Sequence, residues 1–135
     1  PTIHHWGPIL TLKNVAFLSL QFDDDSQDIL LAKQLFGAEI LKVEDINLRD
    51  DLDQTASLCK ALAGVIAPST TTAHLSGSVG TKTIIMDRTT PWSPMINNKQ
   101  DAVIPSIQRI FPPNVDDWKW NFEKARSVVK GWLRE

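Results

Sequence analysis

The sequence predicts an α/β fold with about five parallel strands between two layers of helices. Short apolar runs typical of buried strands alternate with segments whose apolar residues recur at helical spacing. The connections are short enough for right-handed crossovers between parallel strands. The 135 residues, 42% of them hydrophobic and 22% charged, suit one domain of two or three packed layers.

The first strand is predicted at residues 15–20, a partly β-branched apolar run typical of a central strand. The acidic turn at residues 23–26 then supplies capping oxygens for a helix that ends at Gly37. A second short strand is predicted at residues 39–43.

The next helix has Asp50 or Asp51 as its cap and Gly64 as its stop. Residues 65–67 form the third strand, since Pro68 cannot continue a central ladder. The hydroxyls of residues 69–72 are expected to cap a tight helix that Gly80 stops.

The fourth strand, residues 83–86, ends at Asp87. Residues 88–106 follow as a proline-containing connection, long enough to suggest a functional or partner-contacting loop. After a last strand at residues 107–111, an amphipathic helix capped by Asn114 or Asp116 is predicted. Its buried stripe comprises Trp118, Phe122, Ala125, Val129 and Trp132.

This order predicts a Rossmann-like three-layer domain over residues 12–135, preceded at residues 1–11 by a linker or a truncated interdomain segment. Ligands of such domains bind at the carboxyl edge of the strands. Here that edge is predicted to contain residues 19–25, 68–72 and 87–92.

The composition argues against several function classes. Fourteen basic and sixteen acidic residues give a net charge of -2 with no Lys/Arg cluster, which disfavours nucleic-acid and anionic-membrane binding. The single cysteine, Cys59, excludes an internal disulfide and a thiolate metal cluster. Without an apolar run long enough for a membrane span and without a signal peptide, the expectation is a soluble, cytoplasmic protein.

An anion site is predicted where the third strand leads into its helix. Free backbone N–H groups and the positive end of the helix dipole meet the hydroxyls of Ser69, Thr70, Thr71 and Thr72 there. Alternatively, Ser69 only caps the helix and the threonines only fill its first turn. His74 is either part of this site or a core histidine bonded to a backbone carbonyl.

Residues 67–83, A-P-S-T-T-T-A-H-L-S-G-S-V-G-T-K-T, resemble the D-T-x-x-x-H-L-A-G-A-L-G-K-P segment of heptosyltransferase-like (family 9) and tetratricopeptide-repeat-fused bacterial glycosyltransferases. Further matches in register are F-L-S-L-Q at residues 17–21, D-D-L-D-Q-T-A-S-L at 50–58 and D-D-W at 116–118. The chain departs from the family at Ser69, where the family has Asp, and at Thr83, where it has Pro.

The resemblance implies the C-terminal, donor-binding half of a GT-B glycosyltransferase. By position, Ser69, Thr70, Thr71, Thr72 and His74 are expected at the donor diphosphate. Ser19 and Gln21 are expected to face the same cleft. Arg88 could reach a phosphate and Trp92 could stack on the base, or they are a solvated arginine and a packed tryptophan.

The resemblance further implies an inverting, metal-independent transfer from a nucleoside-diphosphate sugar, which is substrate rather than cofactor. The acceptor and the general base belong to an N-terminal domain, so the chain alone is expected to be inactive. The alternatives are a non-catalytic degenerate module serving as scaffold or sensor, and half of a GT-B sugar-nucleotide epimerase.

Four other features have structural interpretations. The three aspartates at residues 23–25 could attract a divalent cation but are expected to form a solvated, capping turn. His4 and His5 are expected to be exposed, and Cys59 to be a buried, inert thiol. Gly77 is expected to allow close packing of helix on sheet.

Overall fold

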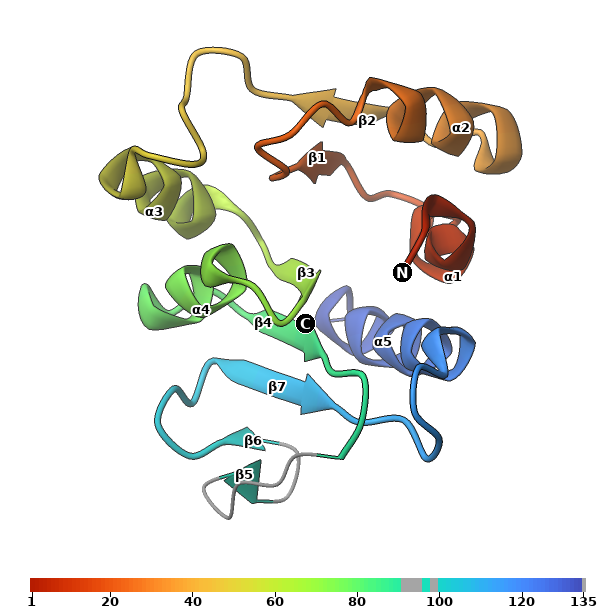
Figure 1. Ribbon diagram of the computed structural model, residues 1–135, viewed down its shortest axis with the longest axis vertical. Helices are drawn as coiled ribbons and strands as arrows, with labels where there is room; N and C mark the ends of the chain where they lie inside the picture. The colour runs from red at the N-terminus through yellow and green to blue at the C-terminus, as the bar shows by residue number, and fades with distance from the viewer. Residues whose placement is uncertain (91–95, 98–99, 135) are drawn as a thin grey trace.

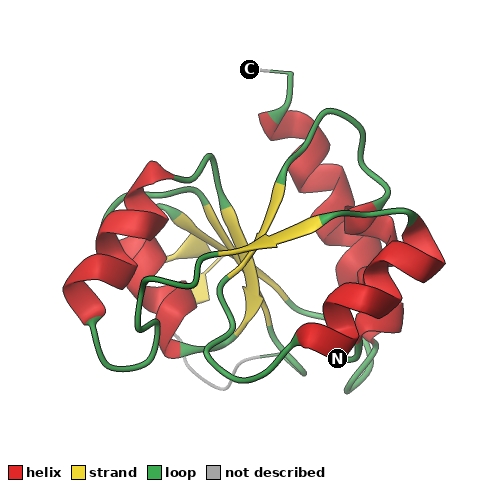
Figure 2. Ribbon diagram, turned by 90° about the horizontal axis from the view of Figure 1, so that it is seen from above, coloured by secondary structure: helices red, strands yellow, loops and turns green. Residues whose placement is uncertain are grey.

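Strands and helices alternate along the chain in the computed structural model, which describes residues 1–90, 96–97 and 100–134 (Figure 1). The helical elements are η1 (Ile3–Trp6), α1 (Gly7–Leu10), α2 (Ser26–Phe36), α3 (Leu52–Ala61), α4 (Thr71–Ser78) and α5 (Trp118–Trp132). The strands are β1 (Phe17–Ser19), β2 (Ile40–Lys42), β3 (Val65–Pro68), β4 (Thr83–Met86), β5 (Ile96–Asn97), β6 (Gln100–Asp101) and β7 (Ile107–Ile110). Helices lie on both sides of the strands (Figure 2), so the predicted α/β class is confirmed.

The expected single parallel sheet is wrong, because the strands form two sheets. β1 and β2 pair in parallel as a separate two-stranded sheet, so the first strand is not central. β3, β4 and β7 are parallel neighbours, and β6 and β5 extend them in antiparallel pairing. No backbone ladder joins β1 to β3 within the described residues. Instead, side chains connect the two sheets, since Phe17 packs on the same apolar cluster as Ile66 of β3.

The position of β3 explains why Pro68 belongs to it after all. β3 pairs only with β4 and is therefore an edge strand of the larger sheet. A proline is tolerated at a sheet edge, where its missing N–H removes no hydrogen bond from an inner ladder. Strands β5 and β6 lie within the connection that was expected to be a long loop, residues 88–106.

β4 is the centre of the fold, and all four of its residues are buried. Ile84 and Met86 pack against α5 on one face, in a cluster with Phe122. Ile85 packs with Ile107 and Ala73 beneath α4 on the opposite face. The alternation of side chains along β4 thus places α4 and α5 on opposite sides of the sheet.

Residues 1–11 are not a detached linker. Residues 3–10 form η1 and α1, and Ile9 is 1% exposed in the cluster with Phe122 of α5. The indole of Trp6 lies 4.8 Å from the Phe122 ring, and the His5 ring stacks on the same phenyl at 6.4 Å. Of the two histidines expected to be exposed, only His4 is so. The two helices of this segment, with four residues each, are too short to reveal a helix by periodicity.

Helix ends follow the sequence closely. The Asp51 carboxylate accepts the N–H of Gln54 at 3.0 Å, and Gly37 ends α2 in the left-handed region at φ 66°. α5 begins one residue later than predicted, since Asp117, rather than Asn114 or Asp116, accepts the N–H of Trp120 at 3.0 Å. Asp116 has a φ of 60° at the position where the D-D-W match has glycine in the resembling family, and left-handed φ is where glycine is favoured.

The buried stripe of α5 and the burial of Cys59 are confirmed. Phe122, Ala125 and Val129 are buried, and Trp118 and Trp132 pack on the same cluster. Cys59 is fully buried, which raises the pKa of its thiol by desolvation. A Cβ on Gly77 would overlap the Ile107 side chain, so this glycine does permit close packing of α4 on β7. Within the described residues, none of the helices is long and apolar enough to cross a membrane.

Candidate functional site

The first turn of α4 follows the carboxyl end of β3 and is held by its own cap. Thr70 is the cap residue: its hydroxyl accepts the N–H of Ala73 at 3.3 Å. The proposed capping by Ser69 is therefore wrong, and Thr70 is at least partly a structural residue. Thr71 is exposed and Thr72 half-buried, and neither hydroxyl is hydrogen-bonded to a described residue.

The backbone adds donors to the same turn. The first N–H groups of a helix have no partner inside it. The N–H of Ala73 is bonded by the cap and that of His74 by the carbonyl of Thr70 at 3.2 Å. The amides of Thr71 and Thr72 make no such bond to any residue that the structure describes. Two amides and two hydroxyls thus remain available at this end of α4.

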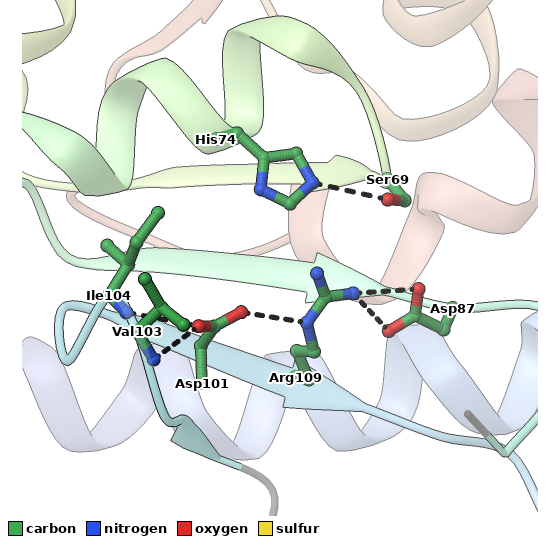
Figure 3. A network of polar contacts seen from close by, with 7 residues as sticks. All are labelled: Ser69, His74, Asp87, Asp101, Val103, Ile104 and Arg109. Carbon is green, nitrogen blue, oxygen red and sulfur yellow. Dashed lines mark hydrogen bonds and ion pairs between the residues drawn. The ribbon is translucent and has the colours of Figure 1, made fainter. Parts of the chain in front are cut away.

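His74 lies over the same edge of the sheet. Its Nε2 atom is 3.5 Å from the Ser69 hydroxyl, so the histidine braces the turn that precedes the helix (Figure 3). The alternative that His74 is a core histidine bonded to a backbone carbonyl does not hold, since its ring is only half-buried and its neighbours are polar.

A buried ionic network lies beside His74 (Figure 3). Nη1 of Arg109, on β7, donates to both carboxylate oxygens of Asp87 at 3.0 and 3.1 Å, and Nε donates to Asp101 at 3.2 Å. The three side chains are only 10–18% exposed. The network joins the end of β4, where Asp87 follows Met86, to β6 and β7.

The two carboxylates of this network differ. Burial raises the pKa of Asp87, and the hydrogen bonds and charge of Arg109 only partly offset this desolvation. Burial acts in the same direction at Asp101. There, however, the N–H groups of Val103 and Ile104 together with Arg109 outweigh it, so the pKa of Asp101 is lowered.

The sequence placed Asp87 at this edge, within residues 87–92, but missed Asp101 and Arg109. One signal was present: Arg109 interrupts the apolar run of residues 107–111, and a charged residue in a buried strand requires a charged partner. The partner could not be identified from sequence, because Asp101 lies in a strand that has no apolar periodicity.

The remaining predicted site residues do not join α4. Arg88 donates to Asp116 through Nε at 2.7 Å and Nη2 at 2.8 Å, an exposed pair that ties the end of β4 to the start of α5. Trp92 lies outside the described residues. Gln21 is exposed, and its N–H donates to the Ser19 hydroxyl at 3.3 Å.

Ser19 belongs to a second polar cluster at the ends of β1 and β2. Its hydroxyl donates to the buried Asp25 carboxylate, which also accepts from the ammonium of Lys42. The acidic turn is therefore only partly solvated as predicted, since Asp25 is 3% exposed. The N-cap residue of α2 is Asp25, but its side chain makes no capping hydrogen bond. The Asp24 carboxylate accepts the N–H of Ser26 at 3.0 Å in the same turn.

The Asp25 cluster predicts a loss of stability in acid. Burial disfavours its charge, but the hydrogen bonds from Lys42 and Ser19 prevail and lower the pKa of Asp25. A lowered folded-state pKa stabilises the fold above the unfolded pKa of about 4 and loses this stabilisation as the pH falls through the folded value.

Asp25→Asn should therefore lower the free energy of unfolding at pH 7, by a difference that shrinks as the pH falls below about 4. Urea unfolding across this range measures it. Lys42→Met should show the same trend, because it removes the other charge of the pair. A wild-type–variant difference that stays constant over the whole pH range would contradict the assignment.

Metal binding finds no support in the described part of the chain. No group of three or more His, Cys, Asp or Glu side chains there is arranged to hold an ion. An open depression at the start of α3 is lined by Asn47, Asp50, Asp51, Leu52 and Asp53. Its three carboxylates make it an unfavourable place for an anion.

The chain is similar in sequence to a known protein. It is 39% identical over 127 residues to Protein FlbA of Caulobacter vibrioides, a match that covers 94% of this chain and 21% of FlbA. The chain thus spans about a fifth of the length of the curated relative that it matches. No family model matches the chain. No solved structure matches it significantly either.

Proposed function

We propose that the chain is the donor-binding half of a glycosyltransferase, a Rossmann-like domain that holds the diphosphate of a nucleoside-diphosphate sugar at the start of α4. The observation that carries this proposal is the set of available donors there: the amides and hydroxyls of Thr71 and Thr72, which no described residue engages.

General chemistry favours a phosphate at this position. Helix N-termini bind anions through unpaired N–H groups and the helix dipole. Ligands of parallel sheets bind beyond the carboxyl ends of the strands, and α4 begins there. In a glycosyl transfer, donors fixed at this point would stabilise the charge that develops on the leaving diphosphate.

The proposal assigns the other half of the reaction to other parts of the protein. Acceptor binding and the general base would lie in a second domain that faces the α4 edge across a cleft. On this proposal the chain binds nucleotide by itself but transfers no sugar, and the reaction needs no metal ion.

Two observations favour the rival function, a non-catalytic module. Ser69 stands where the resembling family has an aspartate, and its hydroxyl is directed to His74. Arg88 and Arg109 are both engaged by carboxylates. A module of this kind would keep the fold and have lost the donor.

Calorimetric titration with UDP, ADP and GDP separates the two functions. We expect at least one of them to bind, and the double variant Thr71→Ala/Thr72→Ala to bind it about ten- to a hundredfold more weakly, since each hydroxyl donates to a charged acceptor. Ser78→Ala is the matched control, because it removes a hydroxyl from the opposite end of α4. Absence of binding would favour the non-catalytic module, and equal affinity of the double variant would refute the phosphate site at the start of α4.

A further inference from the structure

The geometry points to Arg109 as the cation of the anion site at α4: its Nη2 group donates to a phosphate oxygen while Nη1 and Nε stay on Asp87 and Asp101. The assignment of this diphosphate to a nucleotide rests on the proposed function. The contact between Arg109 and a diphosphate group is argued from the structure alone. It also distinguishes Arg109 from Arg88, the arginine that the sequence suggested.

The position of Arg109 in β7 places it under the first turn of α4. Ile107 packs beneath Ala73 and against Gly77 of α4. Side chains two residues apart on a strand share a face, and they lie about 6–7 Å apart along it. Arg109 is therefore on the α4 face, one step closer to the carboxyl edge than Ile107. Asp87, which accepts from Arg109, also feels the charge of His74 of α4.

Two of the three guanidinium nitrogens are fixed. Nε and Nη1 donate to Asp101 and Asp87 at 3.0–3.2 Å, and the side chain is nine-tenths buried. Asp101 is itself held, because one of its oxygens accepts the N–H groups of Val103 and Ile104 at 2.9 and 3.0 Å. A side chain braced in this way presents its remaining donors at a preset position.

The third nitrogen is the one without a protein partner. Nη2 carries two N–H groups and donates to none of the residues that the structure describes. In Figure 3 it points from Arg109 toward the side of His74. Nη2 is not among the buried side-chain atoms that lack a partner, so it is open to solvent and accessible to a ligand. A phosphate oxygen at the start of α4 is a suitable acceptor.

The attraction for a diphosphate comes from the N–H donors at this edge, because one guanidinium and two carboxylates leave the Arg109 network itself without a net positive charge. A diphosphate carries several charges and forms charge-assisted bonds with arginine. The amides of Thr71 and Thr72 and the helix dipole add attraction from the opposite side. Arg88 lacks this setting, since its side chain is 70% exposed and lies against Asp116.

Inorganic pyrophosphate is the probe that tests Arg109 apart from the nucleotide. We expect the 135-residue chain to bind it, and Arg109→Lys to weaken the binding at least about tenfold, because an ammonium cannot hold both aspartates and also reach the ligand. Lysine keeps the balancing charge, which protects folding, and a thermal melt confirms it. Arg134→Gln removes one exposed charge beyond the far end of α5 and should change the affinity less than about twofold.

A second measurement needs no variant. In nitrogen-15 NMR of the unmodified chain, the side-chain N–H signals of Arg109 should shift on saturation with pyrophosphate, while those of Arg134 stay in place. An unchanged Arg109 signal, equal affinity of Arg109→Lys, or absence of pyrophosphate binding would each overturn the inference.

The same titrations separate this inference from the proposed function. Pyrophosphate binding through Arg109 without binding of any nucleoside diphosphate would leave the anion site standing and overturn the donor-binding function. Nucleotide binding that is insensitive to Arg109→Lys would support the function and overturn the role of Arg109.

Discussion

Replacing Arg109 with leucine is expected to lower the free energy of unfolding by about 3–5 kcal/mol, since removal of one partner from a buried ionic group leaves uncompensated charge. The two aspartates would remain in a site where they are only 12–18% exposed. Burial already raises the pKa of Asp87 with the arginine present. Urea unfolding at pH 7 measures the loss.

Two comparisons isolate the cause. The triple variant Arg109→Leu/Asp87→Asn/Asp101→Asn should regain much of the lost stability, because no buried charge remains. Arg88→Leu should cost far less, because its pair with Asp116 is open to solvent. Equal losses for Arg88→Leu and Arg109→Leu would show that the network beneath α4 is not a buried one.

Ile9→Ala is expected to destabilise the fold by about 2–5 kcal/mol, the cost of truncating a large side chain inside a packed core. Ile9 is 1% exposed and packs in the same cluster as Phe122 of α5 and Ile84 of β4. The effect would show that the N-terminal segment belongs to the core of the domain. Thermal and urea unfolding both report it.

Leu30→Ala is the control for this prediction, since the same kind of truncation in α2 removes a side chain that is 49% exposed. A substantially smaller loss is expected there. Equal losses at the two positions, or a negligible loss at Ile9, would mean that η1 and α1 are dispensable, as expected of a linker.

Most helices and strands could be predicted from the sequence, because their apolar periodicity and the residues at their ends are strong local signals. The stripe of α5, the cap at Asp51 and the stop at Gly37 all depend on interactions within a few residues of the chain. The split into two sheets could not be predicted from the sequence. It depends on whether β1 and β3, which are far apart in sequence, pair through backbone hydrogen bonds or only through side-chain packing at Phe17.

The N-terminal segment shows a related limit. η1 and α1 have four residues each, too few to display an amphipathic period. Their burial is determined by α5, more than a hundred residues later, through the contacts of Ile9 and Trp6 with Phe122.

The candidate site was predicted in part. The donors at α4 are local, since strand, cap and helix start follow one another in sequence, and the structure places them together. The role of Thr70 as cap shows that a hydroxyl at a helix start first serves the helix. Arg109 and Asp101 were missed because they lie on separate strands, β7 and β6, and meet Asp87 only in the folded sheet.

The most direct test of the central claim, that the start of α4 holds a diphosphate, is backbone amide NMR of the nitrogen-15-labelled chain during titration with the tightest-binding nucleoside diphosphate. The largest shifts are expected at residues 69–74, with smaller ones at Asp87 and Arg109. Shifts that gather instead around the acidic depression at the start of α3, or amides of Thr71 and Thr72 that stay unchanged at saturation, would contradict the claim.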